Sequence, residues 1–132
     1  MFGLFKKKQA GTDPAQPPPP EQVIDVNSGE DFSDLTTVEL CDQAAIDGRI
    51  EPFLIIGEQF GGEDAGPNLI LGPRGAAAAK ARIDEEIVAA IQAGNEVNLE
   101  ASLQYADGPS RVPQSVRFDL GSLGVRVLKL WG

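Results

Sequence analysis

The sequence predicts an α+β fold in which an antiparallel sheet of three to five strands packs against one long helix and one shorter helix. Two patterns predict it: an alanine-rich run with helical periodicity over 76–93, and short segments of alternating polarity from residue 97 onward. A sheet that is apolar on one face needs a cover, so we expect the long helix to lie across it. The 132 residues suffice for one domain, predicted over 23–132, behind a tail of residues 1–22.

The long helix is expected over 76–93 because alanine favours helix and apolar residues recur there at helical spacing. Its apolar face is predicted to hold Ala76, Ala79, Ile83, Ile87, Ala90 and Ile91. Lys80, Asp84 and Glu85 are expected to point elsewhere. Gly94 stands where a residue in the left-handed conformation commonly ends a helix.

The shorter helix is expected over 35–47 and is ended by Gly48. The candidates for its N-cap are Ser33, Asp34, Thr36 and Thr37. Its predicted apolar face holds Val38, Cys41, Ala45 and Ile46. Cys41 is expected to be a small buried side chain rather than a reactive thiol, because the neighbouring Glu39 and Asp42 disfavour a thiolate.

Strand-forming residues predict a short edge strand at 23–26, a buried strand at 53–58 and a strand from Asn68 that runs into a turn. Alternating polar and apolar residues then predict a three-stranded antiparallel meander. Its strands are expected at 97–105, 116–120 and 125–131. The alternation breaks near Leu128, so a bulge or burial on both faces is expected there.

Residues 1–22 are expected to form a disordered tail and a proline-rich linker. Four consecutive prolines favour an extended spacer. Residues 1–8 combine three large apolar side chains with three lysines, and we expect a frayed, soluble terminus. Weak contact of residues 1–8 with an anionic membrane surface is the alternative.

Negative charge is concentrated in residues 21–64. This segment holds 12 of the 20 acidic residues and one basic residue, Arg49, for a net charge of −11. Residues 1–20 carry a net +2 and residues 65–132 carry none. A localised acidic surface accelerates and orients association with a basic partner. The same charge is also consistent with a role in solubility alone.

The residue inventory argues against an enzyme. No histidine is present, which excludes Ser-His-Asp and Cys-His sites, and the single cysteine excludes an intramolecular disulfide. Glu63 and Asp64 lack the spacing of a calcium loop, so no metal or cofactor is predicted. Nucleic-acid binding is not predicted, because the globular part of the chain carries no net positive charge. The single cysteine and the lack of a long apolar run predict a cytoplasmic protein.

These observations predict a non-enzymatic module that binds a basic protein partner through the acidic surface of residues 21–64. We expect the contact to include the glycine-rich loop after residue 57, at Glu58, Phe60, Glu63 and Asp64. An immunity protein that neutralises a basic toxin would have this charge distribution, and so would a DNA mimic.

The alternative function is binding of a small anion or a nucleotide. Gly72, Arg74 and Gly75 precede the N-terminus of the long helix, where free amide donors and the helix dipole attract anions. The Gly-Lys-Ser/Thr core of a nucleotide-binding P-loop is missing. A plain strand-to-helix connection accounts for the same residues.

Overall fold

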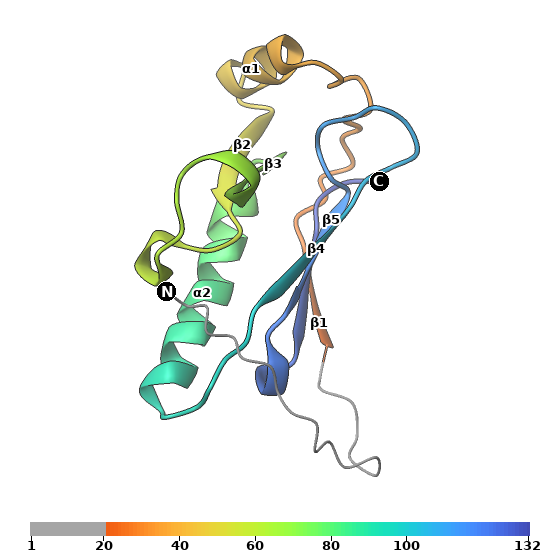
Figure 1. The fold of residues 1–132 in the computed structure, drawn as a ribbon. Helices are drawn as coiled ribbons and strands as arrows, with labels where there is room; N and C mark the ends of the chain where they lie inside the picture. The colour runs from red at the N-terminus through yellow and green to blue at the C-terminus, as the bar shows by residue number, and fades with distance from the viewer. Residues whose placement is uncertain (1–20) are drawn as a thin grey trace.

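The computed structural model describes residues 21–132, and the predictions for residues 1–20 lie outside this part (Figure 1). Its helices and strands confirm an α+β fold. Four strands form the main sheet, in the order β1 (Glu21–Asp25), β6 (Val125–Lys129), β5 (Ser115–Asp119) and β4 (Glu100–Gln104). A separate hairpin consists of β2 (Ile50–Leu54) and β3 (Leu69–Pro73). No helix in residues 21–132 is long and apolar enough to cross a membrane.

The main sheet contains the predicted meander, formed by β4 (Glu100–Gln104), β5 (Ser115–Asp119) and β6 (Val125–Lys129). The predicted edge strand is β1 (Glu21–Asp25), which includes two residues of the predicted linker. It runs parallel to β6, with Val23 opposite Val127, a pairing that the local sequence pattern does not indicate. The register of β6 is continuous, so the broken alternation reflects burial on both faces rather than a bulge.

Helix α2 (Ala76–Gln92) lies across the main sheet, as predicted (Figure 1). Five of its six predicted apolar residues are buried. Ile91 is the exception, because it lies in the last turn beside the exposed residues 92–96 and keeps 42% of its surface exposed. Gly94 follows the helix with φ +91° and donates its N–H to the carbonyl of Ile91, which confirms the predicted cap.

The hairpin of β2 (Ile50–Leu54) and β3 (Leu69–Pro73) packs against the N-terminal part of α2 (Figure 1). The prediction of a strand at 53–58 was wrong in its bounds. The ladder ends where the side chain of Asn68 binds the backbone N–H and carbonyl of Ile56, at 2.7 and 3.0 Å. These two bonds replace strand pairing, and a 3-10 turn begins at Glu58.

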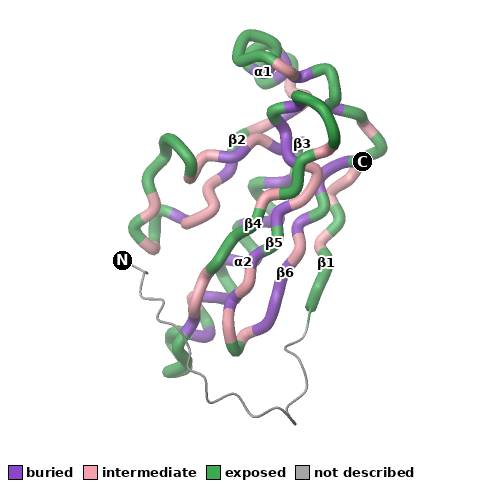
Figure 2. The backbone as a smooth tube through the Cα atoms, turned by 45° about the vertical axis from the view of Figure 1, so that its right-hand side comes forward, coloured by how far each residue is buried: buried purple, intermediate pink, exposed green. Residues whose placement is uncertain are grey.

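Helix α1 (Val38–Ile46) is capped by Thr37, whose hydroxyl oxygen accepts from the Leu40 N–H at 3.1 Å. Only Cys41 and Ala44 of this helix are buried, and Figure 2 shows most of its length exposed. The predicted apolar face was therefore wrong for Val38, Ala45 and Ile46, which are exposed. The physical reason is that α1 packs through one narrow side, mainly toward β2.

The segment before α1 is fixed to the sheet by Phe32. Its ring is 1% exposed and meets Trp131 edge-on, with 6.0 Å between ring centroids. The Phe32 carbonyl accepts from the Ser110 hydroxyl at 2.8 Å, and the Leu35 carbonyl accepts from the Arg111 N–H at 2.8 Å. Phe32 and Leu35 thereby join the same core as α2 and the meander.

Two isoleucines of α2 test this packing. Ile83→Ala removes a side chain that is 1% exposed and should lower the free energy of unfolding by about 2–5 kcal/mol. Ile91→Ala removes the same atoms from an exposed position and should cost less than about 1 kcal/mol. Urea unfolding followed by circular dichroism measures both. Equal losses would contradict the orientation of the helix.

Candidate functional site

The acidic residues of 21–64 divide into internal and exposed groups. Glu30, Asp34 and Glu51 bond to other parts of the chain. On α1 and in the loop between β2 and β3, five further carboxylates are exposed and form no ion pair with a described residue. These are Glu39 and Asp42 on α1, and Glu58, Glu63 and Asp64 in the loop between β2 and β3. Some carboxylates of residues 21–64 thus stabilise the fold, and others are exposed to solvent.

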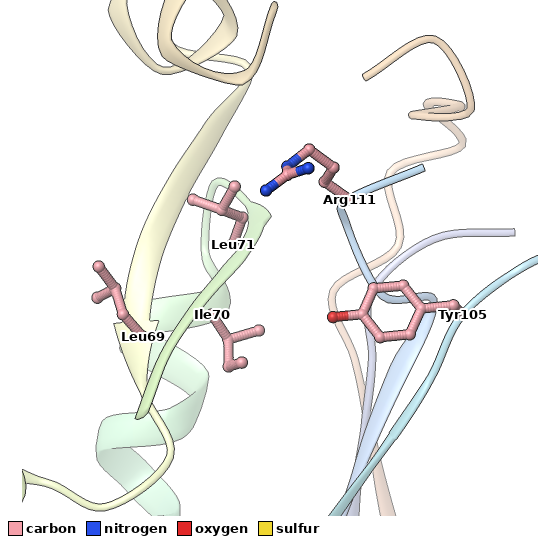
Figure 3. A pocket seen from close by; sticks show the side chains of 5 residues that line it. All are labelled: Leu69, Ile70, Leu71, Tyr105 and Arg111. Atoms are coloured by element: carbon pink, nitrogen blue, oxygen red, sulfur yellow. The ribbon is translucent and has the colours of Figure 1, made fainter. Parts of the chain in front are cut away.

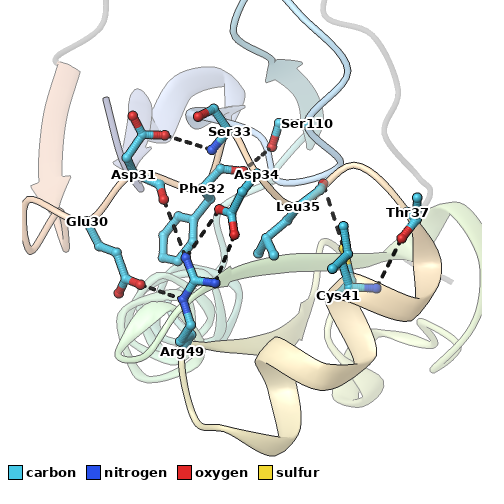
Figure 4. A network of polar contacts seen from close by, with 11 residues as sticks. Glu30, Asp31, Phe32, Ser33, Asp34, Leu35, Thr37, Cys41, Arg49 and Ser110 are labelled. Atoms are coloured by element: carbon cyan, nitrogen blue, oxygen red, sulfur yellow. Dashed lines mark hydrogen bonds and ion pairs between the residues drawn. The ribbon is translucent and has the colours of Figure 1, made fainter.

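Arg49 gathers two residues of the internal group, Glu30 and Asp34, around its guanidinium (Figure 4). Its Nε lies 2.6 Å from Glu30 Oε2, and Nη1 and Nη2 lie 3.2 and 3.3 Å from the two carboxylate oxygens of Asp34. The guanidinium carbon also sits 5.5 Å from the centroid of the Phe32 ring, a cation–π contact. The hydrogen bonds from Arg49 lower the pKa of Asp34, and the two carboxylates raise the pKa of Arg49. Arg49, the only basic residue of residues 21–64, therefore stabilises the fold.

Glu51 occupies the place that the anion hypothesis gives to a ligand. Its Oε2 accepts from the backbone N–H groups of Gly75 and Ala77, at 3.1 and 2.9 Å, at the start of α2. A carboxylate at this position satisfies free donors and complements the helix dipole. An external phosphate would have to displace it.

The three residues of the predicted anion site have different surroundings. Gly72 is buried, and a Cβ there would lie 3.0 Å from the Ala76 Cβ and 3.1 Å from the Phe53 ring, so close packing accounts for this glycine. Gly75 is the N-cap of α2 with φ +100°, a conformation that glycine adopts readily. Arg74 is exposed and extends toward Gly48. The turn is thus explained by backbone and packing requirements.

Helix α1 carries the acidic surface that the sequence analysis did not single out. Glu39, Asp42 and Ile46 follow one another at spacings of three and four residues, so they form one file on the helix. This file lies opposite the buried side, and Ile46 keeps 78% of its surface exposed. Val38 and Leu40 are also exposed, at 52% and 45%. We call Glu39, Asp42 and Ile46 the α1 patch; their spacing in the sequence was the signal that could have found it.

The loop of residues 58–64 brings the four predicted partner-binding residues into one segment. Glu58 and Phe60 belong to a 3-10 turn, and Glu63 and Asp64 follow Gly62. Asn68 holds the loop by donating to the Glu63 carbonyl at 2.8 Å. Phe60 is half-buried and packs against the core, whereas the three carboxylates are exposed. The loop therefore offers charge, and little apolar surface, to a partner.

A buried ion pair lies beneath this loop, on α2. Lys80 and Asp84, which the sequence pattern placed off the apolar face, are 3% and 8% exposed, and their Nζ and Oδ1 atoms are 2.6 Å apart. The Lys80 Nζ also lies 5.5 Å from the Phe118 ring centroid. Burial lowers the pKa of Lys80 and raises the pKa of Asp84. Their opposite charges at a spacing of four residues were the signal in the sequence.

This pair borders a cavity of about 240 Å³ between α2 and the loop. The cavity is also lined by Glu58 and Gln59, and a Cβ on Gly57 would lie 2.9 Å from Asp84 Oδ2. The loop thus closes tightly over the pair. Within residues 21–132, no group of three or more acidic or cysteine side chains is placed to hold a metal ion. Cys41 is buried, and burial is the main cause that raises its thiol pKa.

Removal of Arg49 tests the internal acidic cluster. Arg49→Met should lower the free energy of unfolding by about 1–2 kcal/mol at pH 7, a value kept small because solvent screens half-exposed pairs. Asp34 has a lowered folded-state pKa, so its contribution is complete above the ordinary value of 3.8 and is lost as the pH falls through the folded value. The loss caused by Arg49→Met should therefore shrink at pH 3. Urea unfolding at both pH values checks this, with Arg82→Met as the exposed control.

The buried pair gives a second prediction. Asp84→Ala should cost about 3–5 kcal/mol, because it leaves the Lys80 ammonium buried without a partner. The double variant Lys80→Met with Asp84→Leu should regain most of that loss, since it removes both charges and keeps the volume filled. Urea unfolding of the unchanged protein, Lys80→Met, Asp84→Leu and the double variant completes a double-mutant cycle that measures the coupling. A double variant as unstable as Asp84→Ala would show that the pair itself stabilises the fold.

The chain was compared with protein-family models, curated proteins and solved structures. No family model, no curated protein and no solved structure matches it. Its function must therefore be inferred from the contacts, burial and charges of its own residues.

Proposed function

We propose that this protein is a non-enzymatic interaction module that binds a basic protein partner through the acidic surface of residues 21–64. The observation that carries the proposal is the α1 patch, in which Ile46 is 78% exposed in line with Glu39 and Asp42. An exposed isoleucine contributes binding energy when a partner covers it, and carboxylates beside it select a basic partner. Charge that served only solubility would need neither an exposed isoleucine nor carboxylates placed beside it.

The loop of residues 58–64 adds to this surface by electrostatics. Glu58, Glu63 and Asp64 are exposed, so they raise the rate of association with a basic surface more than they raise affinity. Glu30 and Asp34 share the single positive charge of Arg49, so they contribute less. The proposed contact therefore centres on α1, and the loop steers the partner. A basic toxin neutralised in this way, as by an immunity protein, is one partner of this class.

Charge reversal on the two exposed groups tests the proposal. In pull-downs at low salt, Glu39→Lys with Asp42→Lys should weaken retention of a basic partner by at least about tenfold. The two lysines replace the attraction to the partner by repulsion, directly beside Ile46. Reversal at Glu58, Glu63 and Asp64 should mainly slow association, which surface plasmon resonance resolves. Ile46→Ser, which keeps the charge, should weaken binding at high salt as well.

The matched control is Glu85→Lys with Glu96→Lys, which makes the same change of charge at exposed positions outside residues 21–64. This control should retain the partner. Retention that is unaffected by both reversals and by Ile46→Ser would refute the proposal. A protein that captures no basic partner and loses only solubility on charge reversal would support the solubility role instead.

A further inference from the structure

The hairpin leaves one strand edge open, on β3. The Ile55 N–H donates to the Asn68 carbonyl at 3.0 Å, which fixes the phase of the ladder. Because hydrogen-bonded and non-bonded pairs alternate in antiparallel strands, Leu69 and Leu71 are in non-bonded positions. Their N–H and C=O groups therefore point away from β2, and no strand of residues 21–132 pairs with that edge.

The opposite edge of the hairpin is protected. Pro52 pairs with Leu71 in the same alternation, so the nitrogen that lacks a hydrogen faces outward from β2. Proline on an edge prevents the addition of another strand. On β3, Leu71 is the last residue before Pro73 whose backbone groups point outward, and unlike a proline it has an N–H to donate. Only the β3 edge can therefore accept a strand.

A groove of about 300 Å³ runs along the open edge, and Tyr105 and Arg111 form its far wall. Figure 3 shows both side chains directed toward β3 from the side away from β2. Tyr105 is 49% exposed. Arg111 is exposed and forms no ion pair with a described residue, although its backbone is held by Leu35. Among the described residues that line the groove, the only charged group is thus the guanidinium of Arg111.

We propose that this groove binds an extended peptide segment of an acidic partner, which adds to β3 as a third strand. The backbone of the peptide pairs with the outward N–H and C=O groups of Leu69 and Leu71, as in known cases of strand addition. A carboxylate of the peptide binds Arg111, and an apolar side chain packs on Tyr105. This site differs from the acidic surface in place and in the charge of its partner. The proposal is therefore independent of the function proposed for the acidic surface.

A short fluorescein-labelled peptide tests the site on the full chain. The probe is acetylated and alternates valine with threonine around a central glutamate; a matched probe carries lysine in place of glutamate. The glutamate peptide should bind at least about tenfold more tightly in fluorescence anisotropy, because a charge-assisted bond to Arg111 is lost with lysine. Amide signals of Leu69 and Leu71 should shift in heteronuclear NMR spectra on binding.

Three variants locate the interaction. Arg111→Gln should weaken the glutamate peptide about tenfold, whereas Arg117→Gln, an exposed control on β5, should not change it. Leu71→Pro removes an outward N–H and should abolish strand addition. If that variant fails to fold, a peptide with N-methyl groups on the side that faces β3 provides the same test and should bind at least about tenfold more weakly.

Other outcomes would overturn the proposal. Absence of binding at millimolar peptide, or shifts that avoid Leu69 and Leu71, would rule out the groove as a strand site. Equal affinity for the glutamate and lysine peptides would rule out an acidic partner. Concentration-dependent dimerisation that the peptide inhibits and Leu71→Pro abolishes would instead assign the edge to a second copy of this chain.

Discussion

The insertion of Phe32 between Trp131 and Arg49 is the contact on which the arrangement of the acidic half depends. Helix α1 buries only Cys41 and Ala44, too little apolar surface to hold nine residues in place alone. Phe32 is fully buried and its carbonyl accepts from Ser110, so it fixes the chain before α1 to the loop between β4 and β5. This anchor lets the helix present an exposed face without losing its position.

The charge of residues 21–64 therefore has two separate uses. Carboxylates near the anchor and at the start of α2 satisfy a guanidinium and free backbone donors, and they stabilise the fold. Carboxylates on α1 and in the loop after Gly57 have no such role among the described residues. Net charge alone does not separate these groups, because the separation depends on which side chains lie near Arg49 and Gly75.

Local patterns in the sequence predicted the elements that local physics determines. The alanine run and Gly94 set α2 nearly to the residue, and alternation gave the meander. The parallel pairing of β1 with β6 could not be predicted, because it joins segments about a hundred residues apart and leaves no periodic signal. Burial of Lys80 and Asp84 was missed because charged residues are normally exposed, and only the pairing of the two offsets their desolvation. The sequence indicated the loop residues 58–64 as a candidate contact, and this stays a prediction. The exposed face of α1 could be identified only from the tertiary contacts of the helix.

The position of β1 gives the molecule a polarity. Glu21 lies opposite Val125, at the end of the sheet far from α1, whereas Asp25 leads toward the acidic half (Figure 1). The described chain therefore enters the sheet at one pole, while the acidic helix and the C-terminus lie toward the other (Figure 1). The exposed face of α1 is therefore separated by the length of the sheet from Glu21, the first described residue.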